Sequence, residues 1–107
     1  MTPKTHREVT YIFNMRRNRR FLQKQLALLV GHRHTHMLSK YEQGASLPPL
    51  ETALMLEIAL GVRLPELYPA LYQRLQRHVL LRARGLPPAL RRDVVGRLLG
   101  KDAYADT

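Results

Sequence analysis

The sequence predicts an all-α protein, and three of its features support this fold class. Apolar residues recur at intervals of three and four along most of the chain, which is the spacing of one face of an α-helix. No segment shows a sustained alternation of apolar and polar residues, and β-branched residues are few, so strands are not expected. The 107 residues are 45% hydrophobic and 24% charged, a balance typical of one globular domain. We expect five helices and a possible sixth.

The N-terminal part of the chain predicts three helices. Residues 8–20 place apolar side chains on one stripe and arginines on the remaining face. A short apolar helix, Gln23–Val30, is expected to end at Gly31, because glycine readily adopts the left-handed conformation that terminates a helix. A third helix is predicted over His34–Gln43, and Gly44 is expected to end it.

The rest of the chain predicts a loop followed by further helices. Ala45–Pro49 contains two prolines and is expected to be a loop. Leu50–Leu60 is nearly all apolar, which favours a central buried helix. One helix is predicted over residues 64–83, and an amphipathic helix over residues 87–99, where two prolines open it.

Positive charge is the strongest compositional signal in the chain. Eighteen Lys and Arg stand against eight Asp and Glu, which gives a net charge of +10. The excess is concentrated in residues 1–20 and 69–107, at +5 each, whereas residues 45–68 carry −2. Solvation of helix faces explains any single arginine, but a merely solubilising charge would be interspersed. We therefore expect a polyanionic partner, with nucleic acid ahead of an anionic membrane surface.

Residues 23–44 have the organisation of a helix-turn-helix. That motif needs a small residue where two helices cross closely, a glycine at the sharp turn, and an apolar anchor on the second helix. Ala27, Gly31 and Leu38 are suited to these roles in order.

Together with Arg16 and Gln23, these residues and the run Leu38–Gly44 resemble the phage-repressor-like (XRE-type) helix-turn-helix family. Three later segments, residues 50–52, 59–62 and 65–68, are similar to the fourth and fifth helices of that family. The resemblance covers roughly Ile12–Tyr72. Two features depart from the common pattern: Leu22 stands where the family usually has a Ser or Thr helix cap, and the stretch from Gly31 to Leu38 is one residue longer. Small members with a basic helical C-terminal extension are similar in that spacing.

The resemblance implies a five-helix repressor-like domain over residues 8–72. A basic helical extension over residues 73–100 and a flexible tail over residues 101–107 are expected to follow.

The resemblance also implies a role for each part of the motif, with the helix that begins near His34 lying in the major groove of DNA. The residues expected to contact bases are Thr35, His36 and Lys40 first, then His34 and Ser39. The residues expected to contact phosphates are Gln23, which begins the second helix, and Lys24, Arg33 and Gln43. The residues expected to hold the motif together are Arg16, Ala27, Gly31, Leu38 and Glu42. Arg16 and Glu42 are expected to form an ion pair between the first and third helices.

The implied function is that of a sequence-specific double-stranded DNA-binding transcriptional regulator, acting as a dimeric repressor. One alternative is an antitoxin that represses its own operon and masks a toxin through its basic C-terminal part. Another is an RNA-binding or scaffold protein that uses the same folded module.

An enzyme, a metal site and a membrane span are not expected. No nucleophile–base pattern or phosphate-binding glycine loop is present, and the chain has no cysteine. His32, His34 and His36 invite a zinc interpretation, but only the outer pair shares a helical face and no carboxylate is near in sequence. No uncharged run approaches the ~20 residues that a membrane helix needs. We expect a cytoplasmic, nucleoid-associated protein with no cofactor or metal.

The predicted helix over residues 64–83 carries an apolar stripe with two interpretations. Its members are Tyr68, Tyr72, Leu75 and Val79. The stripe, with the helix over residues 87–99, can form the seam of a homodimer, and we expect the residues beyond Tyr72 to do so. The competing interpretation is that these faces pack on their own domain while the seven arginines of this part follow DNA phosphates.

Overall fold

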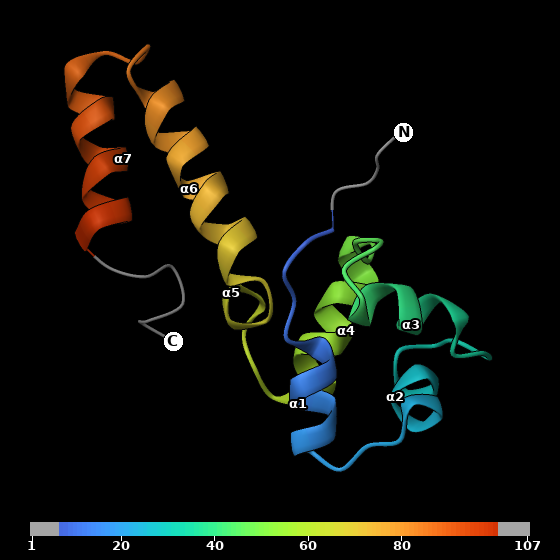
Figure 1. The fold of residues 1–107 in the computed structure, drawn as a ribbon. Helices are drawn as coiled ribbons and strands as arrows, with labels where there is room; N and C mark the ends of the chain where they lie inside the picture. Colours follow the sequence, from blue (N-terminus) through green and yellow to red (C-terminus); the bar gives the residue numbers. More distant parts are fainter. Residues whose placement is uncertain (1–6, 101–107) are drawn as a thin grey trace, which may run out of the picture. The chain divides into compact units, whose positions relative to one another are not determined.

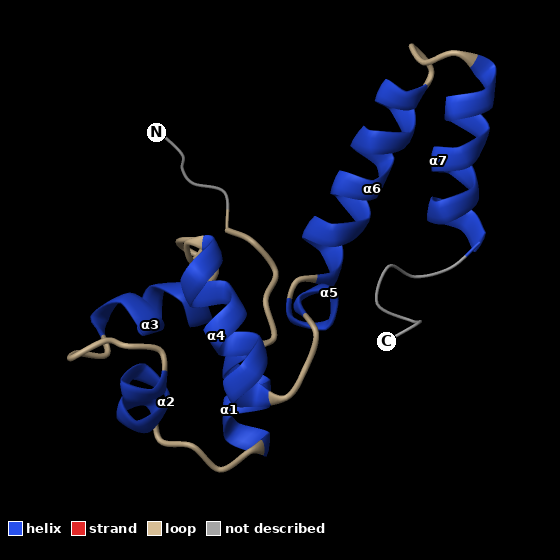
Figure 2. Cartoon of the chain, turned by 180° about the vertical axis from the view of Figure 1, so that it is seen from behind, coloured by secondary structure: helices blue, strands red, loops and turns tan. Residues whose placement is uncertain are grey.

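A computed structural model describes residues 7–100, and the side chains of residues 7–98; within this part every regular element is a helix (Figures 1 and 2). The all-α fold class is therefore confirmed. The helices are α1 (Ile12–Asn18), α2 (Gln23–Leu29), α3 (His36–Glu42), α4 (Leu50–Leu60), α5 (Leu64–Leu67), α6 (Pro69–Ala83) and α7 (Pro88–Gly100). The chain divides between Leu71 and Tyr72 into two compact units, which are described separately.

The first unit has one hydrophobic core, to which helices α1–α5 all contribute. Its largest fully buried side chains are Ile12, Leu26, Val30, Leu38, Leu56, Leu60 and Leu67. Tyr41 and Tyr68 are also buried in this cluster. Burial raises the pKa of the Tyr68 phenol above its ordinary value of 10.0, so this side chain is uncharged at neutral pH. Tyr68 is thus a core residue and not part of an exposed seam.

Helix α1 begins at Ile12, four residues later than the sequence predicts. Residues 8–11 are instead tied to the core through their backbone: the Glu8 amide donates to the Gly44 carbonyl at 2.9 Å, and the Tyr11 amide to the Leu67 carbonyl at 2.9 Å. These two bonds hold residues 8–11 against distant carbonyls, so the segment precedes the helix instead of extending it. Val9, which lies within the helix predicted over residues 8–20, is outside the observed helix and half exposed.

The helix predicted over residues 64–83 is two helices. Tyr68 interrupts it with φ −134° and ψ 62°, and α6 begins at Pro69. A proline excludes the residue before it from the helical region and is itself favoured at the first helical position. The break is therefore a direct consequence of Pro69.

Helix α4 is only half buried, so the prediction of a central buried helix is wrong. Thr52, Ala53, Leu56 and Leu60 form its buried side. Its outer side exposes Leu50 at 72%, Leu54 at 42% and Ile58 at 78%. An apolar composition all round the helix made the two sides indistinguishable by sequence pattern.

Two left-handed glycines end the helices that matter most here. Gly31 follows α2 with φ +82°, and Gly44 follows α3 with φ +74°. The residue after each glycine donates its backbone amide to a carbonyl in the last turn of the helix. The His32 amide donates to the Ala27 carbonyl at 2.9 Å, and the Ala45 amide to the Lys40 carbonyl at 2.9 Å. This pairing is the Schellman motif, and it confirms both predicted stops.

The second unit contains the rest of α6 and helix α7, which lie side by side as a hairpin (Figures 1 and 2). Among residues 72–98, Ala83 alone is buried. Val94, Val95 and Leu98 of α7 are partly buried. None of the helices in residues 7–100 has the length and apolar character needed to cross a membrane.

Candidate nucleic-acid interface

Helices α2 and α3 pack against each other across a short turn, residues 30–35 (Figure 1). Ala27 on α2 is 1% exposed and Leu38 on α3 is 0% exposed, so each lies in the core as the crossing requires. Gly31 opens the turn in the left-handed conformation, and a Cβ built on it would meet no atom within 4 Å. The glycine is needed here for its backbone conformation rather than for space.

The outer side of α3 carries polar and basic side chains only. His36, Lys40 and Gln43 are exposed and follow one another at intervals of four and three residues, which places them on one helical face. Leu38 and Tyr41 are buried on the opposite face. Ser39 lies at the edge and its Oγ accepts a hydrogen bond from Gln43 Nε2 at 3.1 Å. This face is the part of the motif that is free to meet a ligand.

Helix α3 starts at His36, two residues after the predicted start at His34. His32 turns partly inward, with its ring 6.2 Å from that of Tyr41. The chain then uses Arg33 and His34, both exposed, to complete the turn before Thr35. Thr35 is the half-buried residue before the helix and makes no side-chain cap. Of the five predicted base-contacting residues, His36, Ser39 and Lys40 therefore lie on α3, while His34 and Thr35 precede it.

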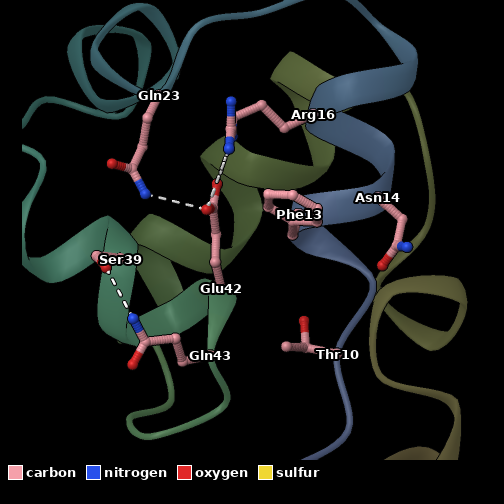
Figure 3. Close-up of a pocket in the computed structure, with 8 residues that line it drawn as sticks. All are labelled: Thr10, Phe13, Asn14, Arg16, Gln23, Ser39, Glu42 and Gln43. Atoms are coloured by element: carbon pink, nitrogen blue, oxygen red, sulfur yellow. Dashed lines mark hydrogen bonds and ion pairs between the residues drawn. The ribbon is translucent and has the colours of Figure 1, made fainter.

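The predicted Arg16–Glu42 ion pair is confirmed (Figure 3). Arg16 Nε lies 2.6 Å from Glu42 Oε2, and the two side chains are 9% and 6% exposed. Arg16 NH1 also donates to the Phe21 carbonyl at 3.0 Å. One guanidinium thus fixes α1, the loop after it and α3 in a single arrangement, with bidentate geometry suited to a carboxylate.

Glu42 also orients Gln23, the first residue of α2 (Figure 3). Gln23 Nε2 donates to Glu42 Oε1 at 3.0 Å. A side-chain amide has two N–H groups, so this bond leaves one for another acceptor. The carboxylate of Glu42 accepts hydrogen bonds from Arg16 and Gln23 together.

An open hollow of about 470 Å³ lies where α1, the start of α2 and α3 meet. Figure 3 shows the residues that line it: Thr10, Phe13, Asn14, Arg16, Gln23, Ser39, Glu42 and Gln43. The charges of Arg16 and Glu42 compensate each other, and the remaining polar groups are hydroxyls and amides. The hollow therefore offers mainly neutral hydrogen-bonding groups.

The other predicted phosphate contacts, Lys24 and Arg33, are exposed on α2 and in the turn. The structure also brings Arg7 to α3, a position that the sequence pattern did not single out. Its NH1 donates to the Gln43 carbonyl at 3.4 Å, at the C-terminal end of α3. The contact joins residues 36 apart, and no local pattern reveals such a contact.

The arginines at residues 16–20 have different roles. Arg19 Nε donates to the Leu60 carbonyl at 2.8 Å and so satisfies the end of α4. Arg17 lies over the Phe13 ring at 5.6 Å. Arg19, like Arg16, is thus occupied in stabilising the fold.

Within residues 7–100 no group of three or more His, Asp or Glu side chains is arranged to hold a metal ion. Comparison of the chain with protein-family models, with curated proteins and with solved structures finds no match.

Proposed function

We propose that this protein is a sequence-specific double-stranded DNA-binding transcriptional regulator, built on a repressor-like helix-turn-helix and acting as a dimeric repressor. Helix α3 lies in the major groove, and α2 crosses the adjacent phosphate backbone. The observation that carries the proposal is the outer face of α3, where His36, Lys40 and Gln43 are exposed while Ala27, Gly31 and Leu38 hold the helix against α2.

The chemistry of this face suits a base-pair edge. The Lys40 ammonium donates to the O6 and N7 acceptors that guanine presents in the major groove. His36 stands at the N-terminal end of α3, the end that reaches base edges in this docking geometry. His34 and Thr35 precede it and contact bases from the turn. Ser39, held by Gln43, contributes a hydroxyl that accepts and donates.

Phosphate contacts come from the residues around this face. Lys24 and Arg33 supply exposed cations, and Gln23 and Gln43 supply amide N–H groups. Glu42 keeps Gln23 at the start of α2, so the Arg16–Glu42 pair positions a DNA contact while it stabilises the fold. With a net charge of +10, the chain is attracted to any polyanion, and α3 supplies the discrimination among sequences.

The test is an in-vitro selection from a random duplex library, followed by affinity measurements on the selected site. We expect Lys40→Gln to weaken binding to that site by about 10-fold and to relax preference at one base pair. Arg77→Gln removes the same charge from the second unit and is expected to leave the preference unchanged. If Lys40→Gln weakened binding equally for every duplex sequence, α3 would not be the helix that contacts the bases.

The duplex selection, together with a binding assay on a structured RNA, separates the proposed function from the RNA-binding, scaffold and toxin-binding alternatives. A structured RNA bound as tightly as the selected duplex would favour the RNA-binding function. No enrichment of any duplex sequence would favour a scaffold or a toxin-binding protein.

A further inference from the structure

Arg20 is the one left-handed residue between positions 7 and 100 that is not a glycine. Its φ is 65°, and the other positive φ values in this part of the chain belong to Gly31, Gly44 and Gly61. All four residues stand where a helix ends. A left-handed backbone brings the Cβ of an L-residue too close to the next carbonyl oxygen, so glycine is favoured there and arginine is not. The chain thus has a strained position between α1 and α2.

The backbone at Arg20 is fixed by the way α1 ends. The Arg20 amide donates to the Arg17 carbonyl at 3.0 Å, and the Phe21 amide to the Arg16 carbonyl at 3.1 Å. This is the Schellman arrangement, which places a left-handed residue at the position of Arg20. A glycine would complete the same arrangement without strain. The arginine side chain is therefore not what ends the helix.

The guanidinium of Arg20 has no partner within the described residues. The side chain is exposed, and it takes part in no hydrogen bond or ion pair there. Its neighbours differ, because Arg16 pairs with Glu42 and Arg19 donates to the Leu60 carbonyl. Strained residues that give nothing to the fold are typical of functional sites. Arg20 is such a residue, so its side chain is expected to meet a ligand.

An open hollow of about 530 Å³ lies beside Arg20, and it is lined by Arg16, Arg17, Arg20, Phe21 and Leu22. No carboxylate is among the described residues that line it, and Arg16 is compensated by Glu42. The cations left are Arg17 and Arg20, both exposed. The Arg17 guanidinium lies over the Phe13 ring at 5.6 Å, a contact that restricts the side chain without neutralising its charge. This hollow is here named the arginine hollow, and its charge suits an anion.

We propose that Arg17 and Arg20 bind a backbone phosphate of duplex DNA beside the base pairs that α3 contacts, and that arginine stands in a glycine's place for this reason. The planar guanidinium presents N–H groups in a fork that matches two phosphate oxygens. Arg16 lines both the arginine hollow and the hollow of Figure 3, where Gln23 begins α2. The site thus adjoins the end of α2 that meets phosphate in the proposed function, on which this inference rests.

The apolar part of the arginine hollow favours a phosphodiester over a free phosphate ion. Leu22 is 61% exposed and Phe21 is half buried. A phosphate in a nucleic-acid backbone is flanked by sugars, whose C–H edges can lie against these two side chains. An inorganic phosphate is hydrated on every side and gains nothing from them. A contact to phosphate and sugar carries no sequence information, so Arg17 and Arg20 add affinity rather than preference.

Arg20→Gly separates a DNA contact from a structural role, because the two predict opposite signs. Relief of the strained backbone is expected to raise the melting temperature by about 3 °C. Loss of the phosphate contact is expected to weaken duplex binding about 10-fold and to make the slope of log K against log salt shallower by about 1. Both effects are measured on the full chain, by thermal unfolding and by fluorescence anisotropy. A lower melting temperature, or an unchanged slope, would overturn the proposal.

Two further variants control for charge alone. Arg20→Lys keeps both the strain and the charge, so we expect the salt slope and the melting temperature to stay unchanged and the affinity to fall less than about 3-fold. Arg77→Gln removes an exposed cation of the second unit and is expected to weaken binding less than about 2-fold. Equal losses for Arg77→Gln and Arg20→Gly would show that Arg20 acts only through the net charge, which contradicts a site.

The choice of duplex keeps this inference separable from the proposed function. Arg20→Gly is tested on the selected duplex and on a scrambled one, and we expect the same fold loss on both. A loss confined to the selected duplex would make Arg20 a base contact and overturn the proposal. If selection enriches no sequence but the slope still becomes shallower on a random duplex, the phosphate contact stands without sequence-specific regulation.

Inorganic phosphate and vesicles of anionic phospholipid test the other sources of phosphate chemistry. We expect neither to bind more weakly to Arg20→Gly than to Arg77→Gln. Phosphate or vesicle binding that is lost in Arg20→Gly, with duplex binding retained, would assign the arginine hollow to a small anion or to a membrane, and would overturn the DNA contact.

Discussion

At the scale of single residues, two ion pairs of the same length lie in very different surroundings. Arg16–Glu42 and Arg97–Asp93 both have N–O distances of 2.6 Å. The first pair is 9% and 6% exposed, and the second is 72% and 54% exposed. Water screens the second pair, whereas each partner of the first depends on the other for compensation.

Truncating one partner of each pair should therefore have unequal effects. We expect Glu42→Ala to lower the free energy of unfolding by about 3–5 kcal/mol, because the Arg16 charge is left buried without its carboxylate. Asp93→Ala is expected to cost less than about 0.5 kcal/mol, as for other exposed i,i+4 pairs. Urea unfolding of both variants provides the comparison. If Glu42→Ala keeps its stability and loses DNA binding, Glu42 belongs to the interface and not to the fold.

The two glycines of the motif allow a second comparison. Gly31→Ala should cost about 1–2 kcal/mol, because a left-handed backbone is the only obstacle to a methyl group there. At Gly44 the added Cβ would also collide with the backbone carbonyl of Glu8. We expect Gly44→Ala to cost about 3 kcal/mol or more, measured by thermal or urea unfolding. Similar losses at both positions would mean that the segment before α1 yields easily.

Some of these residue roles were predictable from sequence and others were not. Arg16 and Glu42 were identified through the family resemblance, which relates positions 26 residues apart. The helix ends at Gly31 and Gly44 were predictable, because helices commonly stop at glycine. The Arg7–Gln43 contact and the Arg19–Leu60 bond depend on tertiary structure alone.

At the scale of elements, each predicted helical range contains a helix, and most of the differences between prediction and structure concern where the helices begin and end. Pro69 carried enough local information to place the break between α5 and α6, because a proline restricts the residue before it. The start of α1 depended on backbone bonds from Glu8 and Tyr11 to distant carbonyls, which no local pattern specifies. Because α3 starts late, three of the residues expected to contact bases, His36, Ser39 and Lys40, lie on the helix, while His34 and Thr35 lie in the turn before it.

Helix α4 tests how burial divides a uniformly apolar element. Leu56 is 0% exposed and Ile58 is 78% exposed, two residues apart in sequence. We expect Leu56→Ala to cost about 2–5 kcal/mol and Ile58→Ala to change stability by less than about 0.5 kcal/mol. Urea unfolding at low protein concentration measures both. A large loss for Ile58→Ala would show that the outer side of α4 is covered in solution.

At the scale of the whole molecule, the two units carry the same net charge of +5, and the uneven distribution of charge lies within the first unit. The first unit holds ten Lys and Arg and five Glu, and the second holds eight Lys and Arg and three Asp. Much of the negative charge in the first unit lies in α4 and α5, away in sequence from the α2–α3 motif. The uneven placement of negative charge was visible in the sequence. The structure adds that Glu42, the carboxylate of the motif, is buried in its pair with Arg16, so the exposed charges of the motif are cations.

The central claim, sequence-specific binding of duplex DNA, is tested most directly by one salt titration. The affinity of the full chain is measured for the selected duplex and for a scrambled duplex between about 50 and 200 mM salt. With about five to eight phosphates neutralised, log K is expected to fall against log salt with a slope of about −5 to −7. The selected duplex should remain at least ~10³-fold tighter than the scrambled one at physiological salt. A slope shallower than about −2, or equal affinity for the two duplexes, would contradict the account.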